Sequence, residues 1–124
     1  MAEGLVLSEQ RHLARRELIY YLKITDRKSG RELGRMGDLH GEGMLVLGEK
    51  PLKTGDIFHI NLELPKALQS LGHLEIPLTC EAVWSRPGPK NSTYFESGVR
   101  FISPDAQQKT TISKLIDLFA MPGQ

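Results

Sequence analysis

The sequence of 124 residues has little cysteine, little net charge and no long apolar run. Its single cysteine, Cys80, excludes an internal disulfide and any cysteine-rich zinc module, and its place in an alternating strand pattern predicts a buried thiol. No stretch approaches the roughly 20 apolar residues of a membrane helix, and the N-terminus lacks a basic-then-apolar signal peptide. We therefore expect a cytoplasmic protein that does not insert into a membrane.

The numbers of basic and acidic side chains are almost equal. With 16 basic and 15 acidic side chains, the net charge of +1 argues against the strongly basic face that a general nucleic-acid-binding protein needs. Basic residues are nevertheless concentrated early in the chain, diluted by acidic ones: Arg11, Arg15, Arg16, Lys23, Arg27, Lys28, Arg31 and Arg35. A nucleic-acid partner is therefore not expected, and any anion must be recognised by a local cluster.

Residue types that catalyse reactions or bind metals occur in no known arrangement. The histidines His12, His40, His59 and His73 are not paired with one another at helical spacing, and no thiolate cluster accompanies them, so no metal site is expected. The chain has no nucleophile–base motif, Walker loop or dinucleotide fingerprint. We expect neither an enzyme nor a protein with a cofactor.

Alternating apolar and polar residues predict about six short strands separated by turns. The expected strands cover 18–25, 32–38, 43–47, 58–64, 76–84 and 94–102. In the fifth, the side chains from Leu78 through Cys80 and Ala82 to Trp84 are expected to share one face. Consecutive strands with tight connections favour an antiparallel meander, and closure into a small barrel would remove its edges.

One helix is predicted after the strands. The segment Ser103–Asp105 is typical of a helix start with proline placed early, and apolar residues from Ile112 to Phe119 recur at the spacing of one helical face. We therefore predict a single, mainly β domain over 18–120, a six-stranded antiparallel β-barrel with a C-terminal amphipathic helix. Residues 1–17 have no apolar run to anchor them and are expected to form a flexible N-terminal arm.

Two features lie on either side of the first predicted hairpin. Arg11 and Arg15 are four residues apart in the arm, and guanidinium groups suit phosphates and the N7 and O6 acceptors of guanine. Asp38 begins a glycine-rich turn that ends at Gly43, and a carboxylate accepts hydrogen bonds from N1 and N2 of guanine. Taken alone, the arginines also fit a solvated surface and the turn fits an ordinary β-turn.

In this order the two features resemble the signature of PilZ domains, which are bacterial receptors for the second messenger cyclic di-GMP. The family has an R-x-x-x-R arm before the first strand, here Arg11 to Arg15, and a (D/N)-x-S-x-x-G turn after the second, here Asp38 to Gly43. The segments 18–22, 82–84 and 98–101 also resemble the family. The resemblance covers nearly the whole chain and implies a barrel of the split-barrel type with a C-terminal helix.

The resemblance also implies roles for individual residues in a cyclic di-GMP site. Arg11 and Arg15 would hold the phosphates and stack on, or bond to, the guanine bases. Asp38 would bond the polar edge of one guanine, and Gly43 would keep the turn open. Arg16 is an auxiliary contact, or it replaces Arg15 if the register differs by one.

This chain departs from the family pattern at His40, which stands where the family has Ser. The loss of one neutral hydrogen bond costs about 0.5–1.5 kcal/mol, which micromolar binding would survive. An imidazole directed into the site would cost more through its bulk. Alternatively, His40 contacts the base itself and makes binding depend on pH. The sequence leaves these alternatives open.

Two functions follow from the resemblance. In the first, the chain is a stand-alone PilZ protein of motility or biofilm regulation: cyclic di-GMP orders the arm against the barrel and creates a surface for an unidentified downstream protein. In the second, it is a degenerate PilZ-like adaptor that does not bind the nucleotide and acts only through protein–protein interaction. The downstream partner, the ligand stoichiometry and the oligomeric state do not follow from the sequence.

Overall fold

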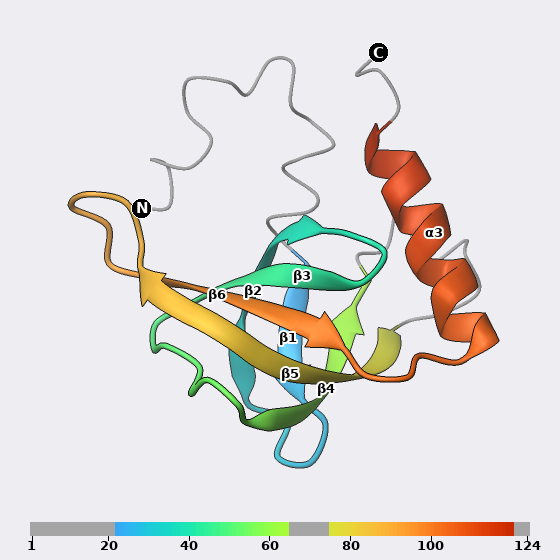
Figure 1. Ribbon diagram of the computed structural model, residues 1–124, viewed down its shortest axis with the longest axis horizontal. Coiled ribbons are helices and arrows are strands. Elements are labelled where there is room, and N and C mark those ends of the chain that lie inside the picture. Colours follow the sequence, from blue (N-terminus) through green and yellow to red (C-terminus); the bar gives the residue numbers. More distant parts are fainter. Residues whose placement is uncertain (1–21, 65–74, 121–124) are drawn as a thin grey trace.

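In the residues that the structure describes, a closed barrel of antiparallel strands with a helix beside it makes up the fold (Figure 1). The computed structural model describes residues 22–64 and 75–120, without the side chains of 118–120. The strands are β1 (Lys23–Asp26), β2 (Glu32–Leu39), β3 (Gly43–Gly48), β4 (Ile57–Glu63), β5 (Glu75–Pro87) and β6 (Phe95–Phe101), and the helix is α3 (Ala106–Ala120). The predicted mainly β barrel with a C-terminal helix is confirmed.

The order of strands around the barrel differs from the expected meander. The runs β1–β2–β3 and β4–β5–β6 are each meanders, but β3 pairs with β6 and β1 pairs with β4. A continuous meander would have placed β4 beside β3, so that expectation was wrong. The connection over 49–56 is longer than the hairpin loops of about two to five residues, so β4 need not return beside β3.

The barrel interior follows the alternation of the sequence. On β4, Ile60 and Leu62 point inward and are almost completely buried, as predicted. On β5, Leu78 and Cys80 lie in the same core cluster. The predicted buried thiol is therefore confirmed, and its burial raises the pKa of Cys80 to about 12. A thiol with so high a pKa is a packing group, because the reactive form is the thiolate.

The end of β5 departs from the predicted alternation. The pairing register shifts between Ala82 and Trp84, which marks a β-bulge, and the side chain of Trp84 is 39% exposed instead of buried. A bulge inserts one extra residue and so moves the following side chains to the opposite face. A Cβ atom at Gly98 would overlap the indole, which shows that Trp84 lies over this glycine on the outer surface.

The helix α3 begins where the sequence predicts. The carboxylate of Asp105 accepts a hydrogen bond from the N–H of Gln108, and the Gln108 side chain accepts one from the N–H of Asp105, each at 2.7 Å. This reciprocal capping box satisfies two backbone donors at the start of a helix. Ile112 and Leu115 bury the inner face of α3 against the barrel. No helix within the described ranges is long and apolar enough to cross a membrane.

Candidate functional site

The structure describes part of the predicted site. The residues Asp38, His40 and Gly43 lie at the turn between β2 and β3, and Arg11, Arg15 and Arg16 lie outside the described residues. The roles of the three arginines and of the arm over 1–17 therefore stay predictions. The structure shows the part of the predicted site that belongs to the barrel.

The turn between β2 and β3 is held at both ends of its short loop. The N–H of His40 donates to the carbonyl of Gly43 at 2.8 Å, which closes the hairpin. The N–H of Phe101 in β6 donates to the carbonyl of Glu42, also at 2.8 Å. These two hydrogen bonds fix the loop backbone relative to β3 and β6, and they thereby fix the Cα positions from which the loop side chains extend.

Both carboxylate oxygens of Asp38 are engaged within this turn. Oδ1 accepts a hydrogen bond from the N–H of Leu39 at 2.9 Å. Oδ2 lies 3.3 Å from Nε2 of His40, and the two side chains are 55% and 71% exposed respectively. The imidazole therefore lies against the carboxylate instead of pointing into the barrel. A ligand that donates to Asp38 must share Oδ2 with His40 or displace it.

Gly43 has a packing role beside the one that the family resemblance implies. It pairs with Arg100 where β3 meets β6, and a Cβ atom there would overlap the carbonyl oxygen of Val99. A residue without a side chain allows such a close approach between two backbones. The glycine is therefore required for the junction of the two meanders, next to the turn that carries Asp38.

Asp38 begins a row of outward-facing positions that crosses four strands. Asp38 pairs with Leu45 of β3, Leu45 with Gly98 of β6, and Gly98 with Trp84 of β5. Neighbouring strands are about 4.8 Å apart, so the row extends over about 14 Å of the surface. We call these four residues the outer strip. A carboxylate lies at one end and an indole at the other, with a half-buried leucine and a glycine that the indole covers between them.

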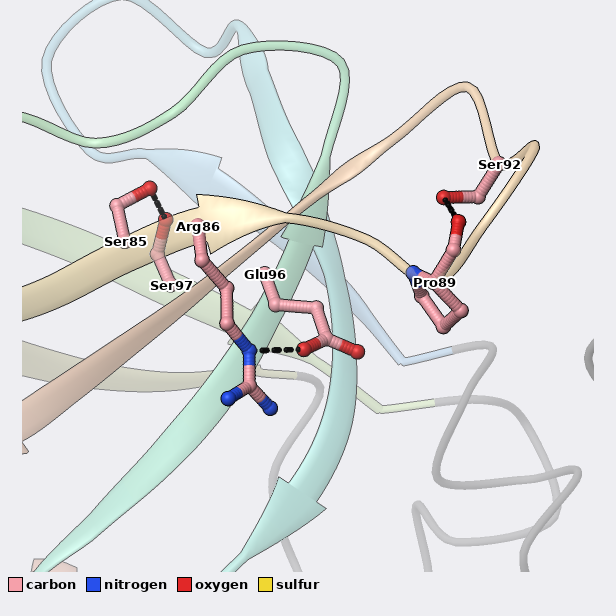
Figure 2. Close-up of polar contacts among 6 residues, drawn as sticks. All are labelled: Ser85, Arg86, Pro89, Ser92, Glu96 and Ser97. Atoms are coloured by element: carbon pink, nitrogen blue, oxygen red, sulfur yellow. Dashed lines mark hydrogen bonds and ion pairs between the residues drawn. The ribbon is translucent and has the colours of Figure 1, made fainter.

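Arginine–glutamate pairs lie on both sides of the outer strip. On one side, Nε of Arg100 donates to Oε1 of Glu81 at 2.7 Å. On the other side, Nε of Arg86 donates to Oε1 of Glu96 at 2.8 Å (Figure 2). The guanidinium carbon of Arg86 also lies 4.9 Å from the centroid of the Trp84 ring. These pairs leave the strip without a strong net charge of either sign.

The sequence pattern did not indicate that Trp84 and Arg86 lie beside the site. Simple alternation predicted Trp84 inside the barrel, because a bulge leaves no mark in the apolar pattern. A usable signal was the spacing of charges: the positions of Glu81 and Arg86 differ by an odd number, yet both side chains face outward. Two charged residues at odd spacing in one strand indicate a change of face between them.

The outer strip is suited to a flat, heteroaromatic ligand that donates hydrogen bonds. A base that stacks on an aromatic side chain gains about 1–3 kcal/mol, and a carboxylate selects for donor groups on the edge of that base. Within the described part of the chain, no group of three or more His, Cys, Asp or Glu side chains is placed to hold a metal ion.

Comparison with known proteins identifies the family. The sequence profile of the PilZ domain matches residues 9–118, so the chain belongs to the PilZ domain family, as the sequence resemblance indicated. The structure is similar to the PilZ domain with c-di-GMP of YcgR from Escherichia coli, with a TM-score of 0.58 and 16% identity over 82% of this chain and 83% of that one. At this identity the likeness concerns the fold. No curated protein matches the chain significantly.

Proposed function

We propose that this protein is a receptor that binds cyclic di-GMP on the outer strip of its barrel. The observation that carries the proposal is the carboxylate of Asp38 at one end of an outward-facing row that leads to the indole of Trp84. Guanine offers two adjacent donors, N1 and N2, to a carboxylate and a flat ring for stacking. Membership of the PilZ family supports the proposal, as does the Escherichia coli PilZ domain described with this ligand.

In this proposal the N-terminal arm supplies the positive charge. Arg11 and Arg15 bind the phosphates and bases, and Arg16 adds a contact or takes the place of Arg15. Asp38 accepts from one guanine, and Gly43 keeps the space beside the turn open. Arginine is suited to this task because its planar fork both binds phosphate and stacks on bases.

His40 acts as a competitor of the ligand for Asp38. Its Nε2 lies 3.3 Å from Oδ2, so a guanine that donates to this oxygen must displace the imidazole or share the oxygen with it. The Ser of the family pattern has a smaller side chain, so His40 lowers the affinity relative to that pattern.

The bound nucleotide passes its signal on by contact. Ligand binding orders the arm over 1–17 against the barrel and creates a new surface for a downstream protein, in the cytoplasm and in control of motility or biofilm formation. The chain itself catalyses no reaction in this scheme. Ordering an arm costs conformational free energy, so the arm closes only where the ligand supplies contacts that offset this cost.

The contact between His40 and Asp38 also favours a second candidate function. An imidazole that occupies the carboxylate permanently would leave no acceptor for guanine. The protein would then be a PilZ-like adaptor that binds other proteins and no nucleotide. The two candidates differ in one measurable property, the affinity for cyclic di-GMP.

Isothermal titration with cyclic di-GMP separates these candidates. The receptor predicts saturable heat that is lost in Arg11→Ala and in Arg15→Ala or Arg16→Ala, whichever is the second motif arginine. Arg31→Ala is the matched control, because this exposed arginine lies in the β1–β2 turn, away from the outer strip. Absence of heat in both the wild type and His40→Ser would establish the adaptor.

A further inference from the structure

Arg86 lies next to the end of the outer strip that is remote from Asp38. It follows Trp84 by two residues on β5, beyond the bulge, and it pairs with Glu96, which in turn pairs with Leu47. The row that contains Arg86 is therefore the next one along the sheet from the row that contains Asp38 and Trp84.

Two contacts fix the guanidinium group of Arg86. Its Nε donates to Glu96, whose side chain is only 14% exposed, and its plane lies near the Trp84 ring. Figure 2 shows the two terminal nitrogens pointing away from Glu96. Within the described residues these terminal nitrogens have no hydrogen-bond partner, and the side chain is 67% exposed. A guanidinium held by Nε presents its remaining donors as a fixed fork.

Such a fork matches one nucleobase edge especially well. Paired arginine donors bind N7 and O6 of guanine, whereas adenine replaces the O6 acceptor by an amino donor. Asp38, at the other end of the strip, matches the opposite edge of guanine, which carries N1 and N2. The surface thus offers an acceptor at one end of the strip and, one row further along the sheet, a donor fork beside the other end. A ligand with one guanine satisfies one of them, and a ligand with two guanines satisfies both.

We propose that Arg86 is a specificity-determining residue that binds the N7 and O6 atoms of the second guanine while Asp38 holds the first. This inference rests on the proposed function and adds to it the reason for preferring two guanines over one. Trp84 lies at the same end of the strip as Arg86, and the guanidinium carbon lies 4.9 Å from the centroid of the indole ring. Glu96 acts as a positioning residue, because it fixes Nε and so aims the fork outward.

Arg86 also has a structural role, which the test must separate from recognition. Glu96 is largely buried, so removal of the arginine leaves a carboxylate without its charged partner, and such losses destabilise proteins. Arg86→Lys keeps a positive charge near Glu96 and removes the planar fork. Should this variant be unstable, the double variant Arg86→Ala, Glu96→Gln removes both charges together and is compared with Glu96→Gln alone.

The test is isothermal titration with cyclic di-GMP and with the mixed cyclic dinucleotide that has one guanine and one adenine. We expect the wild type to prefer cyclic di-GMP, and Arg86→Lys to lower that affinity about tenfold to a hundredfold, because a bidentate contact to guanine is lost. The affinity for the mixed ligand should not change, so the variant loses its preference. Arg31→Lys, in the β1–β2 turn, is the control and should keep the preference of the wild type for cyclic di-GMP.

Three results would overturn the inference. An equal loss for both ligands would mean that Arg86 acts through charge alone. Unchanged binding of cyclic di-GMP by Arg86→Lys would place Arg86 outside the site, although the proposed function would stand. Failure of the wild type to bind either ligand would instead refute the proposed function itself. Thermal unfolding of each variant shows whether a loss of binding reflects a loss of folded protein.

Discussion

The two turns that flank β2 both begin with an aspartate, but they use it differently. In the β1–β2 turn, Oδ2 of Asp26 accepts hydrogen bonds from the N–H and the hydroxyl of Ser29, at 2.8 and 2.9 Å. In the β2–β3 turn, Oδ2 of Asp38 is held by the side chain of His40 at 3.3 Å. Ser29 donates to Asp26 from two groups, whereas the exposed imidazole of His40 makes one longer contact that a ligand can displace. Asp26 is therefore committed to structure, and Asp38 is available to a ligand.

The glycines of the two turns show the same contrast. Gly30 has a φ of 77°, which favours glycine, and a Cβ atom there would touch nothing within 4 Å. Gly43 instead lies where β3 approaches β6 so closely that a Cβ atom would overlap the backbone. The first glycine serves the conformation of its turn, and the second serves the packing of the barrel beneath the site.

The largest effect is expected from removing the carboxylate of each aspartate. Asp38→Ala should lower the affinity for cyclic di-GMP about tenfold to a hundredfold, because a hydrogen bond to a charged acceptor contributes about 1.5–3 kcal/mol. Asp26→Ala should leave the affinity unchanged and lower the melting temperature. Titration calorimetry and thermal unfolding of both variants measure this. If both variants lost affinity equally, the distinction between the two turns would be wrong.

Gly43 and Gly41 test which part of the second turn is structural. Gly43→Ala should destabilise the protein by about 1–3 kcal/mol, because the added methyl group forces β3 and β6 apart. Gly41→Ala should change the free energy of unfolding by less than about 0.5 kcal/mol, since a Cβ atom there meets nothing within 4 Å. Urea unfolding followed by circular dichroism gives both values. Equal stabilities would show that the strand junction tolerates a side chain.

His40 should lower the affinity for cyclic di-GMP through its contact with Asp38. Nε2 of His40 lies 3.3 Å from Oδ2, so the ligand must displace the imidazole to reach this oxygen. The effect should stay below about fivefold, because pairs of exposed side chains of this kind contribute at most about 1 kcal/mol.

The variant His40→Ser should therefore bind cyclic di-GMP up to about fivefold more tightly than the wild type. His59→Ser, on the outer face of β4, is the control and should keep the affinity of the wild type. Titration calorimetry of both variants measures this. An affinity that falls or stays constant in His40→Ser would show that His40 does not compete with the ligand.

The smallest effect concerns Asp26 in acid. The N–H and hydroxyl of Ser29 lower the pKa of Asp26, so its contribution to stability is present above the ordinary pKa near 3.8 and is lost as pH falls. The difference in melting temperature between the wild type and Asp26→Asn should therefore shrink below about pH 4. A difference that stayed constant in acid would show that the carboxylate charge does not stabilise the turn.

Alternation and capping made the barrel and its helix predictable from the sequence. Positions such as Ile60 and Leu62 reveal their burial through alternation alone, and the residues around Asp105 reveal the helix start. The pairing of β3 with β6 was not predictable, because the sequence of a strand does not specify which distant strand it pairs with. The outward turn of Trp84 was missed for a related reason, since it depends on a shift of register against β6.

The candidate site was predictable as a motif and less so as a surface. The order of the arginines, Asp38 and Gly43 along the chain indicated the family. The position of His40 against the carboxylate depends on a rotamer, which a sequence pattern does not specify. The outer strip joins residues from four strands, so it emerged only with the strand order of the closed barrel.

The most direct test of the account uses the single tryptophan of the chain as a reporter. Trp84 lies at the end of the outer strip, so a ligand that binds there changes the surroundings of the indole. Titration of the wild type with cyclic di-GMP should give a saturable change in intrinsic fluorescence, and Asp38→Ala should shift that curve to much higher ligand concentration. Calorimetric binding without any change in Trp84 fluorescence would contradict the placement of the nucleotide on the outer strip.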